Sequence, residues 1–146
     1  VWGAGRGGVH LSPRGDLHDM RDSDPAAFFG HVATELGQRR IAFLCLRERP
    51  GPDSLMPAMR RAFGGRIIAN EGYGFESASE AIARGDADAV AFAKLYLANP
   101  DLVRRFRQEL VLNAWDAATF YSSGAHGYTD YPCVNARDCE AQRVSA

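Results

Sequence analysis

The 146-residue sequence lacks the features that define several common classes of protein. Its 3 cysteines, Cys45, Cys133 and Cys139, are an odd number without a paired framework, which argues against a secreted disulfide scaffold. Cys133 and Cys139 have no histidine between them and are a poor ligand set for zinc. We therefore expect no metal site and a reducing compartment, the cytoplasm.

Long apolar runs and an excess of charge are missing too. No run approaches the roughly 18 apolar residues of a transmembrane helix, so we expect no membrane span. The 17 basic and 18 acidic side chains give a formal net charge of −1. Without a local basic run, this balance excludes a protein that coats nucleic-acid phosphates. Lys94 is the only lysine, and the chain begins with Val1, so we expect it to start partway through a longer protein.

What the sequence does contain is an alternation of short apolar runs and amphipathic helices, which is typical of an α/β fold with parallel strands. Predicted strands begin near residues 8, 41, 66 and 88. Each is followed by apolar residues at helical spacing. After Leu112 the periodicity stops, and residues 133–146 are predicted to be a disordered polar tail.

Local signals predict where the helices begin and end. Asp24-Pro25 and Asn99-Pro100-Asp101 each combine a capping residue with a proline that suits the first helical turn. Gly37 is predicted to end the first helix. Ser77 and Glu80 have the spacing of a capping box, which predicts a helix start at Ser77.

Four βα units fit two architectures. A closed (β/α) barrel needs eight units and about 250 residues, so four units would be half of one. A doubly wound open sheet of the flavodoxin type is built from four or five units. Periodicity alone leaves both open.

A glycine cluster at residues 3–8 matches the G-x-G-x-x-G pattern of dinucleotide-binding loops. That motif works where it follows a strand and opens a helix, because the helix N-terminus then meets the pyrophosphate. Here the glycines precede a strand. We therefore interpret them as an entry loop.

Better candidates lie after the third and fourth predicted strands, because ligands bind beyond the carboxyl ends of parallel strands. Gly72 would let a backbone amide approach an anion, whereas the Glu71 carboxylate would have to turn away from a phosphate. Lys94 is equally compatible with a phosphate-binding cation and a solvated charge. His10 is more typical of a hydrogen-bonded core histidine than of a ligand contact. Tyr121 could line a pocket, although terminal aromatic residues more often pack onto the core.

Several stretches occur in an order that is informative as a whole: Gly8-Val9-His10-Leu11-Ser12-Pro13, Ala87-Asp88-Ala89-Val90-Ala91-Phe92, Leu97-Ala98-Asn99-Pro100-Asp101-Leu102, and Phe120-Tyr121 with Gly127-Tyr128-Thr129-Asp130-Tyr131-Pro132. Together they resemble the C-terminal half of the old yellow enzyme family, the FMN-dependent NAD(P)H ene-reductases. The likeness is greatest to the bacterial branch, which acts on activated alkenes, nitro compounds or nitrate esters. It implies that residues 1–132 are a (β/α)4 half of a TIM-type (β/α)8 barrel, and residues 133–146 have no counterpart.

The resemblance also implies roles for six positions. His10 stands where an arginine commonly contacts the flavin pyrimidine edge, and Tyr121 where an aromatic residue shapes the substrate pocket over the flavin. Backbone amides of Glu71 and Gly72 would bind the FMN phosphate. Ala93 and Lys94 match a glycine–arginine pair on the same phosphate. Glu71 and Ala93 replace glycines, and Lys94 keeps the charge but loses the bidentate fork of arginine.

The family's substrate-binding pair, His/Asn or His/His, and its proton-donating tyrosine lie in the N-terminal half, so the resemblance places no catalytic residue in this chain. We expect little turnover from the chain alone, and either self-association or pairing with an N-terminal half. The alternative is a non-catalytic half barrel that serves in binding or assembly. A third interpretation, an independent flavodoxin-like FMN carrier, suits the length but not the order of the motifs.

Overall fold

A computed structural model of the chain describes residues 3–15 and 19–135. The chain divides into two compact units, Val1–Ala91 and Phe92–Ala146. Most of the predicted tail at 133–146, including Cys139, lies outside the described residues. None of the helices in the described part is long and apolar enough to cross a membrane.

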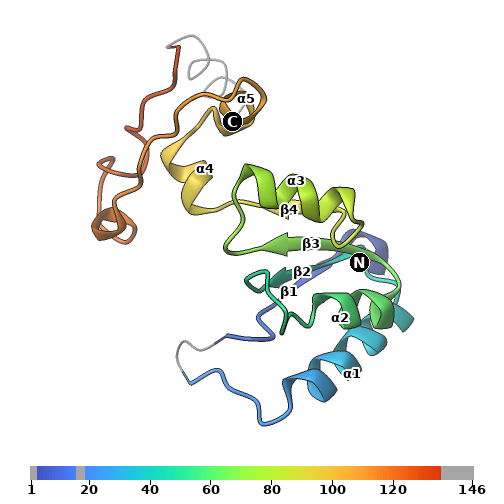
Figure 1. The fold of residues 1–146 in the computed structure, drawn as a ribbon. Coiled ribbons are helices and arrows are strands. Elements are labelled where there is room, and N and C mark those ends of the chain that lie inside the picture. The colour runs from blue at the N-terminus through green and yellow to red at the C-terminus, as the bar shows by residue number, and fades with distance from the viewer. Residues whose placement is uncertain (1–2, 16–18, 136–146) are drawn as a thin grey trace. The chain divides into compact units, whose positions relative to one another are not determined.

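The first unit is built on a four-stranded parallel sheet (Figure 1). Its strands are β1 (Gly8–Leu11), β2 (Phe43–Arg47), β3 (Arg66–Asn70) and β4 (Ala89–Ala91). They are neighbours in chain order, β1-β2-β3-β4, as in a barrel. A doubly wound sheet reverses its strand order at a switch point. The prediction of a partial (β/α) barrel is confirmed, and the flavodoxin-like interpretation is wrong.

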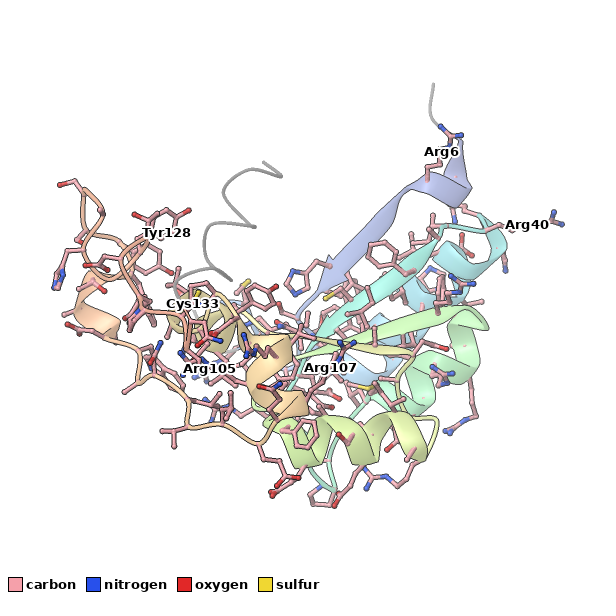
Figure 2. The ribbon with its side chains drawn as sticks, turned by 90° about the horizontal axis from the view of Figure 1, so that it is seen from above. Arg6, Arg40, Arg105, Arg107, Tyr128 and Cys133 are labelled. Atoms are coloured by element: carbon pink, nitrogen blue, oxygen red, sulfur yellow. The ribbon has the colours of Figure 1, made fainter. Side chains whose placement is uncertain are left out.

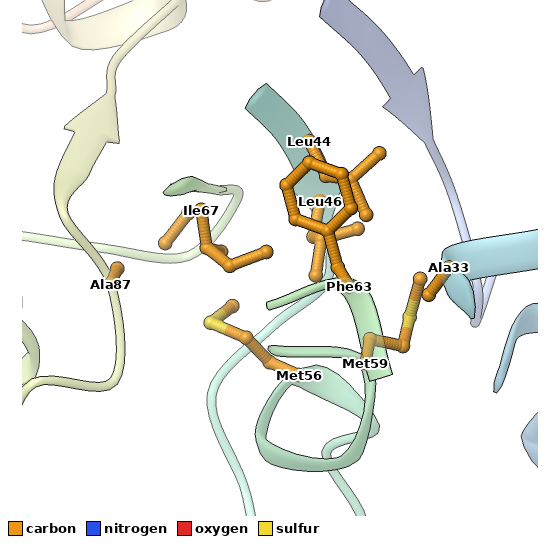
Figure 3. Packing of buried hydrophobic residues seen from close by; sticks show 9 residues of the cluster. Ala33, Leu44, Leu46, Met56, Met59, Phe63, Ile67 and Ala87 are labelled. Carbon is orange, nitrogen blue, oxygen red and sulfur yellow. The ribbon is translucent and has the colours of Figure 1, made fainter. Parts of the chain in front are cut away.

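The helices of this unit pack on one face of the sheet. They are α1 (Pro25–Gln38), α2 (Met56–Phe63) and α3 (Phe75–Ala83), after a short 3-10 turn, η1 (Ala4–Arg6). Leu44, Leu46 and Ile67 are fully buried among Met59 and Phe63 of α2 (Figure 3). Burying such side chains stabilises a fold by about 1.5–3 kcal/mol each.

The opposite face of the sheet has a different character. Among the described residues, every strand side chain in the core cluster comes from the helix-covered face. Alternate positions point the other way, because side chains on a strand alternate between faces. His10, Cys45 and Ile68 form one such row across β1, β2 and β3. Cys45 and Ile68 are half-buried and His10 is exposed.

The sequence signals at the helix ends were partly correct. The Asp24 carboxylate accepts a hydrogen bond from the Ala27 amide at 3.1 Å, which confirms the predicted cap of α1. Gly37 does not end that helix, which continues to Gln38. A Cβ at Gly37 would collide with the Phe63 carbonyl oxygen. The glycine therefore permits close approach of α1 to the end of α2.

The helix α3 begins at Phe75 rather than at Ser77, so the predicted capping box is wrong. Ser77 lies one turn inside the helix. Its hydroxyl oxygen accepts a hydrogen bond from the Gly74 amide at 3.0 Å. Ser77 thus occupies the third helical position, where Glu or Gln accepts the same hydrogen bond from the N-cap amide in a capping box.

The second unit contains α4 (Lys94–Ala98), α5 (Leu102–Arg107) and a 3-10 turn, η2 (Ala117–Thr119). The sequence did not predict α4 as a helix. Asn99 and Asp101 do not cap α5 through their side chains. The Asn99 amide nitrogen instead donates to the Leu95 carbonyl at 2.9 Å, and its oxygen accepts from the Asn113 amide at 2.7 Å.

A buried ion pair organises this unit. Asp101 and Arg105 are 6% and 5% exposed, and the Arg105 Nε donates to Asp101 Oδ1 at 2.6 Å. Arg105 also donates to the carbonyls of Val111, at 2.5 Å, and Pro132, at 2.9 Å (Figure 2). Burial alone would raise the pKa of Asp101. Hydrogen bonds from Arg105 and from the Val134 amide outweigh burial and hold that pKa below its ordinary value.

The cysteines differ from one another. Cys133 is disulfide-bonded, whereas Cys45 is a free thiol. The sequence did not predict a disulfide at Cys133. Burial raises the pKa of the Cys45 thiol, in keeping with its place on β2.

Candidate functional site

The carboxyl ends of the central strands are joined by hydrogen bonds. Arg47, Asn70 and Ala91 lie side by side in the register of β2, β3 and β4. The Asn70 side-chain amide donates to the Ala91 carbonyl at 2.9 Å. The Glu48 amide donates to the Asn70 carbonyl at 3.0 Å. These bonds fix the point from which the chain leaves β3.

The turn that follows β3 has an unusual backbone. Glu71 and Gly72 both lie in the left-handed region, with φ of 77° and 80°. For a non-glycine residue such a conformation costs on the order of 1–3 kcal/mol and persists only where its surroundings enforce it. Gly72 has a second constraint, since a Cβ there would lie 3.2 Å from Arg49 Cγ. The absence of a side chain at Gly72 thus lets the turn pack closely against Arg49.

The Glu71 carboxylate forms ion pairs with two arginines. Its Oε2 lies 2.8 Å from Nε of Arg47, and its Oε1 lies 3.6 Å from Nε of Arg49. The side chains of Arg47 and Glu71 are each 29% exposed. The sequence analysis considered Glu71 without a partner and missed both arginines. The adjacent charges in Arg47-Glu48-Arg49, directly after an apolar strand, were the available signal.

Glu48 is a second residue that sequence reasoning missed. Its carboxylate is 0% exposed and accepts hydrogen bonds at 3.0 Å from the amides of Leu55 and Met56, and another from the Ser54 hydroxyl. Arg14 Nε lies 3.3 Å from it. Glu48 therefore satisfies amides at the start of α2 from the end of β2. Its role is to connect a strand end, a helix start and the loop after β1.

His10 lies on β1 and is exposed. The interpretation as a buried, hydrogen-bonded core histidine is therefore wrong. It occupies the face of the sheet opposite the helix-packed core, in register with Cys45. In a closed barrel that face is the interior.

The second unit carries the other predicted positions. Ala93 precedes α4 and Lys94 is its first residue, and both are exposed. Ala93 borders a shallow hollow of about 490 Å³ within this unit. The other residues that line it are Phe92, Tyr96, Leu97, Pro100, Tyr128 and Thr129.

Tyr121 is fully exposed, so the interpretation as an aromatic packed onto the core is wrong. It follows η2, which a local network holds in place. The Thr119 hydroxyl donates to the Asp116 carbonyl at 2.8 Å, and the Asp116 amide donates to Tyr131 Oη at 2.9 Å. Gly127 has a φ of 67°, and a Cβ there would collide with Thr119.

The predicted positions are thus divided between the two units. The first unit holds His10, Glu71 and Gly72, and the second holds Ala93, Lys94 and Tyr121. Within the residues that the structure describes, no group of three or more His, Cys, Asp or Glu side chains could hold a metal ion.

Comparison with known proteins identifies the class to which this arrangement is similar. No family model matches the chain. The putative 12-oxophytodienoate reductase 12 of Oryza sativa subsp. japonica is 42% identical over 149 residues, which cover 91% of this chain and 37% of that protein. Morphinone reductase, solved in complex with tetrahydroNAD, matches with a TM-score of 0.81 at 37% identity, over 89% of this chain and 36% of its own.

A solved old yellow enzyme from Trypanosoma cruzi also matches, with a TM-score of 0.81 at 34% identity, over 88% of this chain and 35% of its own. The fold is therefore part of a (β/α) barrel like those of these reductases. The chain resembles the old yellow enzyme family, as its motifs predicted, and is consistent with a C-terminal fragment. It spans only about a third of the length of these three proteins.

Proposed function

We propose that this chain is the C-terminal portion of an FMN-dependent NAD(P)H:alkene oxidoreductase and supplies the FMN-phosphate site with part of the substrate pocket. One observation carries the proposal: the Glu71-Gly72 turn, in the left-handed conformation at the carboxyl end of β3, in a chain 34–42% identical to reductases of this type. Parallel-strand proteins bind phosphate groups at this end of the sheet.

The residues present fit an FMN phosphate in part. Gly72 has no side chain to shield the backbone amides of its turn, and Lys94, the first residue of α4 in the second unit, would supply a cation. His10 would donate to the flavin pyrimidine edge, and Tyr121 would border the substrate. Ala93 would approach the phosphate through its backbone. Bound FMN would carry the hydride from NAD(P)H to an electron-poor alkene, a nitro compound or a nitrate ester.

We assign residues 1–132 to the half barrel, residues 133–146 to a tail, and the protein to the cytoplasm.

The uncovered face of the sheet supports a partner for the first unit. In the sheet that the described residues form, β1 and β4 are the edge strands, each with one neighbour. The occupant that best suits this face is an N-terminal half barrel, because this chain spans only 36–37% of the similar reductases. Without that half the chain would self-associate and turn over little substrate.

The test is a titration of the purified 146-residue chain with FMN, followed by quenching of flavin fluorescence. We expect saturable binding that Lys94→Ala weakens about tenfold, because one charge contact to the phosphate is lost. Arg61→Ala, which removes an exposed positive charge from α2, is the control and should leave the Kd unchanged. Equal affinities for all three proteins would show that Lys94 is not in the site.

The rival is a non-catalytic half barrel that folds without flavin. The carboxylate of Glu71, at a position where the resemblance implies glycine, favours it. Absence of binding at high micromolar FMN would support this rival if Glu71→Gly/Ala93→Gly also fails to bind. Recovery of binding in that double variant would instead show that these two side chains obstruct an otherwise intact site.

A further inference from the structure

The Glu71 carboxylate raises a physical difficulty for an anion site. A carboxylate and a phosphate at the same strand end repel one another, and the left-handed backbone of Glu71 is itself unfavourable. An interaction that neutralises the carboxylate and holds the Glu71 backbone in place would offset both effects. The ion pair with Arg47 is the shortest that Glu71 makes, at 2.8 Å.

The geometry of Arg47 suits this task. It is the last residue of β2, and its register partner Asn70 directly precedes Glu71. The backbone bond from the Glu48 amide to the Asn70 carbonyl holds the ends of β2 and β3 together, and the side-chain bond from Asn70 to the Ala91 carbonyl ties the end of β3 to β4. The backbone is therefore fixed on both sides of the ion pair, at Arg47 on β2 and at Asn70 next to Glu71.

We infer that Arg47 is a positioning residue that neutralises Glu71 and draws its side chain toward β2, so that the Glu71-Gly72 backbone stays available to a phosphomonoester. The inference rests on the proposed function and adds to it a residue and a ligand class. Arg49, whose Nε is 3.6 Å from the same carboxylate and whose side chain is 77% exposed, is the weaker member of the pair. Arg47 acts through Glu71 and does not itself touch the ligand.

This assignment makes the effect of Arg47 depend on Glu71. With Glu71 present, removal of Arg47 frees a carboxylate beside the phosphate. With glycine at position 71 there is no carboxylate to neutralise, so removal of Arg47 should not affect the phosphate. Riboflavin lacks the phosphate, so its affinity should not respond in either background.

The experiment measures the Kd of FMN and of riboflavin for the full chain and for Arg47→Gln, Glu71→Gly and the double variant. Arg47→Gln should weaken FMN about tenfold at low salt, leave riboflavin unchanged, and have less than a twofold effect in the Glu71→Gly background. Arg47→Lys should restore most of the FMN affinity. In about 1 M salt the loss should shrink, because the Debye length falls to about 3 Å. Circular dichroism confirms that each variant is folded.

Each other outcome overturns the inference in a distinguishable way. An equal loss in both backgrounds would mean that Arg47 contacts the phosphate directly, and no loss in either would mean that it plays no part. Binding by Glu71→Gly but not by the unmodified chain would refute the neutralisation while keeping the proposed function. Failure of all four proteins to bind FMN would remove the inference and the FMN site together.

Discussion

The Asp101–Arg105 pair gives the sharpest stability prediction. Replacing Arg105 with methionine keeps an unbranched side chain of similar length but leaves Asp101 charged at 6% exposure. It also removes the donors to the carbonyls of Val111 and Pro132. Breaking a buried pair in this way costs about 3–5 kcal/mol, because one charge stays buried without compensation. We expect a loss of that size in the second unit.

Urea unfolding followed by tryptophan fluorescence measures this effect locally. The chain has 2 tryptophans, and a Trp2→Phe background leaves Trp115, in the second unit, as the reporter. Arg107→Met is the matched control, since Arg107 belongs to the same helix and is exposed, and it should change the free energy of unfolding by less than about 0.5 kcal/mol. Indistinguishable midpoints for the Arg105 and Arg107 variants would refute the reasoning.

The same pair predicts an inverted response to pH. In the unmodified chain the pKa of Asp101 is held below its unfolded value of about 3.9. The stability it contributes is therefore complete above that value and is lost as pH falls through the folded pKa. In Arg105→Met, burial would raise the pKa of Asp101, so the variant should become more stable as pH falls. A parallel pH dependence of the two proteins would contradict this.

Three further predictions concern the first unit. Gly37→Ala should destabilise it by about 1–3 kcal/mol in urea unfolding, because the Cβ collides with the Phe63 carbonyl, whereas Gly30→Ala on the same helix meets nothing within 4 Å and should be neutral or stabilising. Asp24→Ala should cost about 1 kcal/mol by the same assay, and Asp24→Asn much less. The raised pKa of Cys45 should make its alkylation at pH 8 slower than that of free cysteine, and an equal rate would contradict its burial.

Much of the first unit could be predicted from sequence, because its signals are local. The apolar run at 41–46 identified β2, which spans Phe43–Arg47. The cap at Asp24 lies within a few residues of the Ala27 amide that it binds. What failed was Gly37, whose neighbour Phe63 is 26 residues away. Glycine suits both a helix stop and a close helix–helix contact, and only tertiary structure tells the two apart.

The second unit was harder to predict for the same reason. Asp101 carries a capping sequence, yet its carboxylate binds Arg105 and the amide of Val134, 33 residues further along. The local capping preference of Asp101 is overridden, because a buried carboxylate must be paired and hydrogen-bonded wherever its partners lie in the sequence. In the candidate site, the turn at Gly72 could be predicted from composition. The partner of Glu71 could not, since Arg47 reaches it only through the register of β2 with β3.

The central claim is that this chain carries the phosphate site of an FMN enzyme. The most direct test compares FMN with riboflavin in parallel titrations of the 146-residue chain, because the two ligands differ only in the phosphate. The account predicts that FMN binds at least about tenfold more tightly, a difference of about 1.4 kcal/mol. Equal affinities, or no binding of FMN, would contradict it.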